Sequence, residues 1–403
     1  MKFSIWYCLS LLECIPKESK TSKDITMINE KRLGDCFTRL AQVDSESFDE
    51  ARIAGVLEDI LRQMGADVAF DDAAAKVGSN SGNLIATFKG NADVEPIFLS
   101  GHMDTVKPGK GVRVLFKDGV FTSDGTTILG SDDKSALAII IEVMTVVREQ
   151  QLLCPPVEII ISVCEEMGLL GAKHLDFSMV KSRFGYILDS TDTQGIVTRA
   201  PSANKITAKV FGRAAHAGAA PENGICALSA ASRAIAGLAL GRIDEETTCN
   251  LGLIAGGAAT NIVPEYVEVN GEARSHDLDK LARVTQRIKD AFETACDRQP
   301  GEDLPRAEVE VVQDFPNTSI PEDHRVITLA REAAANLGRA LESKTIGGGA
   351  DANIFFGKGL MAGVIGTGMT DVHTLKESIK LQDMVSCAEL VLEILQVHAK
   401  GDA

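Results

Sequence analysis

The sequence contains no closely spaced cysteine pairs. Its nine cysteines are spread over 403 residues, and none of them forms a Cys-x-x-Cys motif. This spacing excludes a zinc ribbon and indicates that no disulfide scaffold holds the chain together. Aromatic residues are also scarce, at 5%, whereas 36 glycines favour a closely packed α/β architecture. We therefore expect a cytoplasmic protein with reduced thiols and an ordinary hydrophobic core.

Positively charged residues are also fewer than negatively charged ones. Lys and Arg number 41 against 57 Asp and Glu, which gives a formal net charge of −16 at pH 7. Such an acidic chain is a poor match for nucleic acid or for an anionic membrane surface. After residue 26 the sequence has no apolar stretch long enough to cross a bilayer. We therefore expect neither a nucleic-acid partner nor a membrane partner.

The first 26 residues differ from the rest of the chain. A short apolar run at 5–12 resembles a weak signal peptide, but only Lys2 precedes it and Glu13 interrupts its end. No cleavage site of the small-x-small type follows this run. A normal domain start comes at Met27. We expect residues 1–26 to be an extension without a structural role.

Hydrophobic periodicity predicts an α/β fold with an inserted domain. Three short apolar runs indicate buried strands, and these are 95–100, 157–164 and 185–188. The nearly continuous apolar stretch 136–148 indicates a helix packed against the sheet. Within residues 200–314 the predicted order becomes β-α-β-β-α-β, which is the ferredoxin-like arrangement. The sequence thus predicts one α/β domain split into 27–199 and 315–403 around an inserted domain at 200–314.

Polar side chains of metal-binding types follow the predicted strands. Five of these candidates come directly after the three apolar runs, one precedes the long helix, and one follows a later apolar run at 360–365. The candidates are His102, Asp104, Asp132, Glu165, Glu166, Asp189 and His373. Because sites in open α/β sheets form beyond the C-terminal ends of strands, we expect one crevice to hold them all. Five carboxylates there would repel one another unless divalent metal were bound.

Five sequence motifs resemble those of a dizinc metallopeptidase family. In chain order they are Gly-His-Met-Asp-Thr-Val (101–106), Gly-Ser-Asp-Asp-Lys-Ser (130–135), Glu-Glu-Met-Gly-Leu-Leu-Gly-Ala-Lys (165–173), Leu-Asp-Ser (188–190) and His-Thr-Leu-Lys-Glu (373–377). The family includes peptidase T, glutamate carboxypeptidases and succinyl-diaminopimelate desuccinylase. The wording of the motifs is closest to the peptidase T-like branch, and the resemblance extends from about Met27 to the C-terminus. It implies the zinc-peptidase catalytic domain with a ferredoxin-like lid.

The resemblance also implies two zinc ions per subunit, with cobalt or manganese as substitutes that the mixed ligands suit. His102 would bind one ion and His373 the other, and the Asp132 carboxylate would bridge both. Asp189 would complete the His102 site, and Glu166 would complete the His373 site. Members of the family have a cis peptide bond after the bridging aspartate, which is the bond that follows Asp132 in this chain.

Two further carboxylates match the residues that the family uses in catalysis. Glu165 matches the general base, which takes a proton from the attacking water and delivers it to the leaving amine. Asp104 matches the residue that holds the first histidine through its far ring nitrogen. Because neighbouring residues project in different directions, Glu166 can bind metal while Glu165 stays free for proton transfer.

Segments of the predicted insertion resemble substrate-binding parts of the family. His216 matches a histidine that in many members reaches the active site from the partner subunit or after domain closure. Asn261 and Arg274 lie in two further such segments, and the Arg274 guanidinium would hold a substrate carboxylate. Gly348 lies in a triple glycine before a helix, where backbone N–H groups would meet a carboxylate. These matches imply a homodimer formed through the lid.

The sequence therefore predicts a metal-dependent aminopeptidase that releases N-terminal residues from short peptides. Two alternatives stay open on these residues. An N-acyl amino acid amidohydrolase or a carboxypeptidase would use the same scaffold, and the segment after Asp189 lacks the glycines that peptidase T has there. A non-catalytic homologue that binds peptide or metal is the second alternative, although such a protein would have no need of Glu165.

Overall fold

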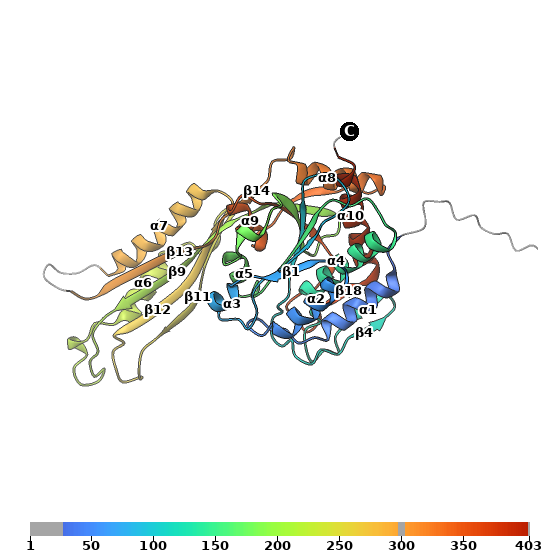
Figure 1. Ribbon diagram of the computed structural model, residues 1–403. Coiled ribbons are helices and arrows are strands. Elements are labelled where there is room, and N and C mark those ends of the chain that lie inside the picture. The colour runs from blue at the N-terminus through green and yellow to red at the C-terminus, as the bar shows by residue number, and fades with distance from the viewer. Residues whose placement is uncertain (1–26, 297–302, 402–403) are drawn as a thin grey trace, which may run out of the picture.

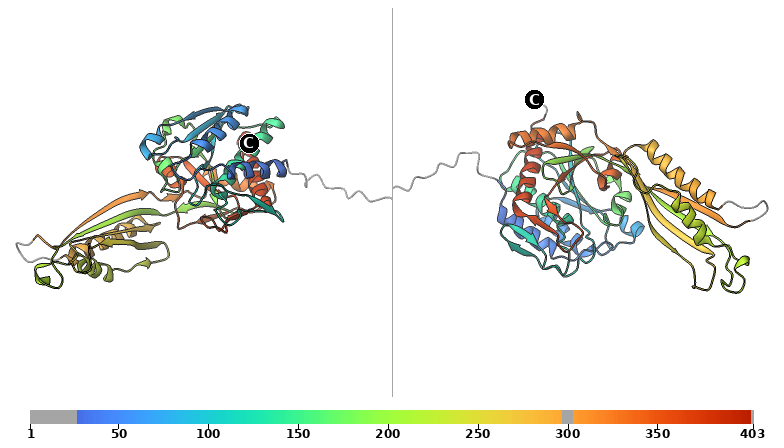
Figure 2. Two further views of the ribbon diagram at one scale, coloured as in Figure 1. Left: turned by 90° about the horizontal axis from the view of Figure 1, so that it is seen from below. Right: turned by 180° about the vertical axis from the view of Figure 1, so that it is seen from behind.

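The computed structural model describes residues 27–296 and 303–401, so the extension expected at 1–26 lies outside the described residues. A large domain contains a nine-stranded and a four-stranded sheet, and a small domain contains a five-stranded sheet. Figures 1 and 2 show the small domain reaching away from one side of the large domain. Among the described residues, no helix has the length and apolar character needed to cross a membrane.

The nine-stranded sheet forms the centre of the large domain. Its order is β1-β2-β6-β3-β7-β16-β8-β14, with β15 paired to β8. The strands are β1 (Asp67–Phe70), β2 (Leu84–Phe88), β3 (Ile97–His102), β6 (Val157–Ser162), β7 (Phe184–Ser190), β8 (Gly195–Ala200), β14 (Thr318–Ser319), β15 (Glu342–Thr345) and β16 (Met361–Gly366). The neighbours β6, β3, β7 and β16 run parallel. Their C-terminal ends therefore meet at one edge of the sheet.

Helices cover the main sheet of the large domain. They are α1 (Glu30–Ala41), α2 (Ala51–Gln63), α3 (Ala73–Val77), α4 (Ser131–Glu149), α5 (Leu170–Lys173), α8 (Arg325–Asn336), α9 (Asp351–Gly357) and α10 (Leu381–Ala399), with a 3-10 turn at Phe177–Met179. The apolar helix α4 packs against strands β3 and β7 and against helices α1 and α10. It begins at Ser131, earlier than the expected 136, and two residues of its first turn keep a non-helical backbone.

A smaller sheet of the large domain has the order β17-β18-β5-β4. Its strands are β4 (Leu115–Lys117), β5 (Val120–Thr122), β17 (Met369–Thr370) and β18 (Ser378–Lys380). All neighbouring strands in it are antiparallel. The connection between β17 and β18 carries His373, so this sheet fixes where the loop with the second predicted histidine begins and ends.

The small domain has the predicted ferredoxin-like plan. Its elements are β9 (Ser202–Phe211), a 3-10 turn (Pro221–Asn223), α6 (Ala227–Ala236), β10 (Gly241–Arg242), β11 (Thr247–Gly256), β12 (Tyr266–Ser275), α7 (Leu278–Ala295) and β13 (Arg306–Phe315). The sheet order is β10-β11-β12-β9-β13, and every pair is antiparallel. Apart from the short β10, this is the β-α-β-β-α-β order with both helices packed on the sheet. The predicted α/β fold class is confirmed.

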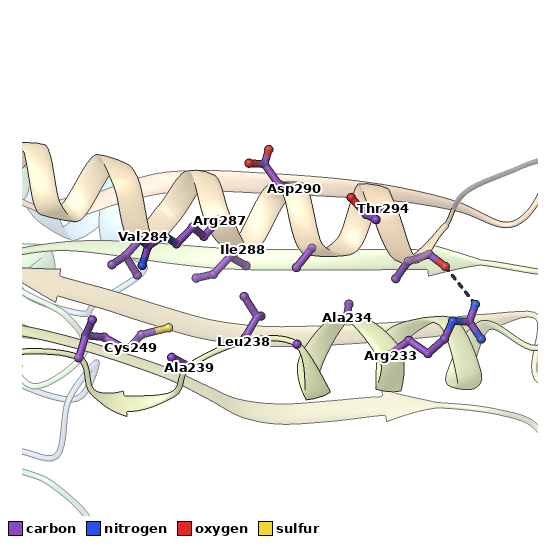
Figure 3. Close-up of a pocket in the computed structure, with 14 residues that line it drawn as sticks. Arg233, Ala234, Leu238, Ala239, Cys249, Val284, Arg287, Ile288, Asp290 and Thr294 are labelled. Atoms are coloured by element: carbon purple, nitrogen blue, oxygen red, sulfur yellow. Dashed lines mark hydrogen bonds between the residues drawn. The ribbon is translucent and has the colours of Figure 1, made fainter.

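A groove of about 660 Å³ lies between α6 and α7 on the small domain (Figure 3). Helix α7 forms one wall, and α6 with the segment after it forms the other. Small and apolar side chains such as Ala234, Leu238 and Ile288 line most of it. None of the predicted metal-binding or catalytic residues borders the groove, so the predicted chemistry belongs elsewhere.

Candidate metal centre

The predicted ligands converge at the C-terminal edge of the parallel strands. His102 ends β3, Asp189 lies near the end of β7, and Glu166 follows β6 by four residues. Asp132 lies in the first turn of α4, and His373 comes from the loop between β17 and β18. The crevice expected from the sequence therefore holds side chains from five separate elements.

The His102 ring is fixed from both sides. Its Nε2 lies 3.0 Å from Asp132 Oδ1. Its Nδ1 lies 3.0 Å from the Asp104 carbonyl oxygen and 3.4 Å from Asp104 Oδ1. The ring is buried, with 2% of its side chain exposed. Nε2 thus faces the carboxylate cluster, and Asp104 holds the far nitrogen, which is the geometry that a supporting residue needs.

The second histidine approaches the same aspartate. His373 Nε2 lies 3.1 Å from Asp132 Oδ2 and 2.8 Å from Glu166 Oε1. Its side chain is 48% exposed, so this part of the crevice is open to solvent. Asp132 therefore turns one oxygen toward each histidine, as a carboxylate shared by two ions would.

Two further carboxylates, those of Asp133 and Asp189, lie beside His102. Ligand atoms of His102, Asp133 and Asp189 all lie within 4.8 Å of one another. One Asp133 oxygen accepts the His102 backbone N–H at 3.2 Å, and the other is buried without a hydrogen-bond partner among the described residues. A Cβ on Gly101 would lie only 2.6 Å from the Asp133 carboxylate. Glycine at this position lets Asp133 approach the strand, next to Asp189.

Glu377 supports the Asp132 loop, a role that no sequence motif predicted. Its two carboxylate oxygens accept the backbone N–H groups of Leu129, Gly130 and Asp132 and the Ser131 hydroxyl, at 2.6 to 3.1 Å. The side chain is buried. Glu377 is the last residue of the fifth motif, and this position was the only feature of the sequence that pointed to it. The peptide bond between Asp132 and Asp133 is cis, as the resemblance implied.

The electrostatics of the cluster follow from burial and from the two histidines. Burial, together with the charge of Asp132, raises the pKa of Asp189 to about 7. Burial would also raise the pKa of Asp132, but hydrogen bonds with both histidines outweigh it and hold that pKa well below its usual range. Hydrogen bonds with Asp132 and Glu166 raise the pKa of His373 to about 10. Asp132 and the two histidines thus favour one another's charged forms.

Glu165 stands apart from these interactions. Its backbone N–H donates to Asp104 Oδ1 at 2.9 Å, but its carboxylate accepts no hydrogen bond from the described residues. Burial, strengthened by the charges of Asp189, Asp351 and Glu166 and opposed by His102, raises its pKa well above the usual range. A carboxylate with these properties is suited to accept a proton.

The donor set fits divalent cations. Around a tetrahedral ion with bonds of about 2 Å, ligand atoms lie roughly 3.3 Å apart. The contacts of Asp132 with His102 and His373, at 3.0 and 3.1 Å, are close to that spacing. No lysine or arginine of the described segments forms an ion pair with Asp132, Glu166 or Asp189. Metal ions are therefore the cations that this arrangement of nitrogen and oxygen ligands accommodates.

His216 and Asn261 lie far from this cluster in the same chain. They belong to adjacent loops of the small domain, where the Ala217 N–H donates to the Asn261 carbonyl oxygen at 2.9 Å, and both are exposed. Strand β9 runs from the large domain outward along the small domain, toward these loops (Figure 1). Its ten residues span roughly 30 Å. This conformation does not bring His216 or Asn261 to the predicted metal ligands of its own subunit.

Arg274 and Gly348 lie together at the other end of the small-domain sheet. The Arg274 guanidinium is held by both oxygens of Glu272, at 2.9 and 3.0 Å. It also donates to the carbonyl oxygen of Gly347, next to Gly348, at 3.3 Å. The two-pronged face expected to bind substrate is therefore occupied by Glu272 in this structure, and a substrate carboxylate would have to displace it.

Comparison with known proteins identifies the family. The model of peptidase family M20/M25/M40 matches residues 98–397. The chain belongs to this peptidase family. The predicted metallopeptidase identity is thereby confirmed, and so is the resemblance on which it was based.

Three relatives match nearly the whole chain. The Bacillus subtilis (strain 168) protein YqjE is 43% identical over 93% of this chain and 100% of its own length. The structure of aminopeptidase PepT from Bacillus cereus is 41% identical, covers 92% of this chain and 99% of its own, and superposes with a TM-score of 0.85. A tripeptidase from Staphylococcus aureus is 38% identical, covers 93% and 100%, and has a TM-score of 0.87.

Proposed function

We propose that this family member is a dimetal aminopeptidase acting on short peptides. The observation that carries the proposal is Asp132, which turns one oxygen to His102 and the other to His373. Beside it lies the Glu165 carboxylate, which accepts no hydrogen bond within the described part of the chain. A shared carboxylate and a free base are the two parts that metal-assisted hydrolysis needs. The names of the Bacillus cereus aminopeptidase and the Staphylococcus aureus tripeptidase support the choice of substrate.

The ligands divide between two ions. His102 with Asp189 would hold one, His373 with Glu166 the other, and Asp132 would serve both. Zinc suits this mixture of imidazole and carboxylate, with cobalt or manganese as substitutes. When bound, the ions would supply a Lewis acid for the peptide carbonyl and acidify a water molecule.

The chain itself moves the proton and holds the groups in place. Glu165 accepts a proton from the attacking water and delivers it to the nitrogen of the leaving amine. Asp104 fixes the His102 ring at Nδ1 and also accepts the backbone N–H of Glu165. One buried residue, through its carbonyl oxygen and its carboxylate, thus sets the spacing between a predicted metal ligand and the proposed base.

Substrate profiling tests the proposed activity. We expect the metal-loaded protein to release the N-terminal residue of tripeptides with a kcat/KM at least about tenfold above that for N-acetyl amino acids. The reason is that a site for a free amino terminus penalises an acylated one that leaves polar groups unpaired. Chromatography of the products from one set of tripeptides and their N-acetylated forms gives the answer. Hydrolysis of the acylated compounds alone would show an amidohydrolase instead.

We further propose that residues 200–314 act as a lid through which two subunits pair. Only two residues of β11 are covered by β10, so the segment from Asn250 to Gly256 is an open sheet edge. Leu253 is 69% exposed and Ile254 52% exposed on that edge. An exposed apolar edge strand is suited to pair with a second copy of itself. Pairing would also place His216 of one subunit beside the other subunit.

Disrupting this edge tests the lid pairing. We expect Leu253→Asp combined with Ile254→Asp to convert a dimer into a monomer and to lower kcat/KM at least about tenfold, because charge opposes strand pairing at an edge. Light scattering after size-exclusion chromatography measures the mass. Leu115→Asp, at a leucine of the large domain that is 51% exposed, close to the 52% of Ile254, is the control. A monomeric unmodified protein with full activity would contradict the proposal.

The proposed cellular location is the cytoplasm. All seven described cysteines are free thiols. Free thiols in this number are typical of a reducing compartment.

A further inference from the structure

A buried glutamate outside the metal cluster contacts the loop that carries the general base. Glu50 precedes α2, and its side chain is fully buried. It forms no ion pair with a lysine or arginine of the described part of the chain. Its oxygens instead accept hydrogen bonds from three residues, Phe48, Ser79 and Cys164. We propose that Glu50 is a positioning residue for Glu165, an inference that rests on the proposed role of Glu165 as the base.

The contacts with Cys164 are direct. Glu50 Oε1 accepts the Cys164 backbone N–H at 3.1 Å and the Cys164 thiol at 3.0 Å. Cys164 immediately precedes Glu165 in the chain. Any rotation of the Cys164 backbone therefore moves the Glu165 carboxylate, and Glu50 restrains that rotation at two points.

The restrained residue has an unusual conformation. Cys164 has a φ of 49°, in the left-handed region that side chains other than glycine seldom adopt. The same Glu50 oxygen also accepts the backbone N–H of Phe48, at 2.9 Å, and Phe48 has a φ of 75°. One carboxylate oxygen thus holds two left-handed residues. Such conformations persist only when surrounding bonds fix them.

Glu50 and Asp104 together hold the backbone of the loop at residues 164–166. Glu50 accepts the N–H of Cys164, and Asp104 accepts those of Glu165 and Glu166 at 2.9 and 3.3 Å. Three successive backbone N–H groups therefore end on two buried carboxylates. Asp104 also holds a predicted metal ligand, whereas the hydrogen bonds of Glu50 reach none. The effect of Glu50 on Glu165 is for this reason separable from metal binding.

Two conservative variants test the positioning role. Glu50→Gln keeps an oxygen at the same reach, so we expect its kcat to stay within about fivefold of the unmodified protein. Glu50→Asp keeps the charge but withdraws it by one methylene, and a displacement of about 1 Å costs roughly 100-fold in rate. We therefore expect Glu50→Asp to lower kcat about 100-fold, with KM within about threefold and two metal ions still bound per subunit.

Glu158 offers a matched control. It is buried in β6, the strand that leads to Cys164, and it accepts the backbone N–H groups of Lys181 and Ser182 without an ion pair to any described lysine or arginine. Glu158→Asp shortens a buried carboxylate that also accepts backbone N–H groups, but at a place outside the loop that carries Glu165. We expect it to lower the melting temperature while kcat of the metal-loaded protein stays within about twofold.

The outcomes separate this inference from the proposed function. Unchanged kcat in Glu50→Asp, or an equal loss in Glu50→Gln, would overturn the positioning role. If Glu50→Asp does not fold, Cys164→Val applies the same test, because a β-branched residue opposes the left-handed backbone; the same loss of kcat at constant KM is expected, and unchanged kcat overturns the inference. Full activity in Glu165→Gln would instead overturn the proposed base, whatever the Glu50 variants do.

Discussion

Replacing Glu165 with glutamine should lower kcat on a tripeptide by about 10³-fold or more while both metal ions stay bound. The amide has nearly the same shape as the carboxylate but cannot accept a proton, and general-base catalysis is worth roughly 10² to 10⁴ in rate. The backbone N–H of residue 165 would still donate to Asp104, so the loop should keep its place. Steady-state kinetics at saturating metal, with metal content from mass spectrometry, make the measurement.

Glu166→Gln is the matched comparison. Glu166 Oε1 lies 2.8 Å from His373 Nε2, within the proposed second metal site. We expect this variant to lose metal at the His373 side, whereas Glu165→Gln loses turnover alone. Glu166→Gln would then fail in metal binding, and Glu165→Gln would fail in turnover. Turnover in Glu165→Gln close to that of the unmodified protein would rule out the proposed base, and loss of metal from it would make Glu165 a ligand.

The sequence located the predicted ligands because strand ends can be read from it. Runs such as 157–164 are apolar enough to be buried strands, and β3 and β6 are indeed buried at all six positions. Parallel strands then bring whatever follows them to one edge of the sheet. The placement of His102 and Asp189 needed nothing beyond this rule.

The supporting residues could not be found in the same way. Glu50 and Glu377 act by accepting backbone N–H groups 114 and 245 residues away along the chain. No local pattern marks such a partner, because a glutamate that will bind main-chain N–H groups has the same sequence signature as one on the surface. Strand β8, Gly195–Ala200, was missed for a related reason. It has only two strongly apolar residues, and its neighbours in the sheet, β16 and β15, are distant in sequence.

Removing the metal ions should lower the melting temperature by roughly 10 °C. A ligand present at about 1,000 times its Kd stabilises the folded state by about 4 kcal/mol. In a domain as large as the one that holds the site, each kcal/mol corresponds to roughly 2 °C, so two ions together account for a shift of this order. The carboxylates of Asp132, Glu166 and Asp189 also lose their neutralising cations when a chelator strips the site. Activity should disappear in the same titration and return when zinc is added back.

The stability of the metal-free protein should depend on pH, because the pKa values of Asp189 and His373 are raised. Asp189 has a pKa of about 7 in the folded metal-free protein against an ordinary value of 3.8, so it binds its proton more tightly when folded. The stability that this proton contributes is complete below pH 3.8 and is lost as pH rises through 7. His373, raised to about 10, likewise contributes stability below pH 6.5 that is lost toward pH 10. The metal-free protein should therefore become less stable from pH 5.5 to pH 8.

The stabilisation that bound metal contributes should instead increase with pH. Protons compete with metal for the same histidine and carboxylate atoms, so metal affinity rises with pH over that range. The difference in melting temperature between loaded and stripped protein should consequently be larger at pH 8 than at pH 5.5. Differential scanning calorimetry of both forms at the two pH values measures it. A difference that shrinks toward pH 8 would mean that the protons and the metal ions do not share these ligands.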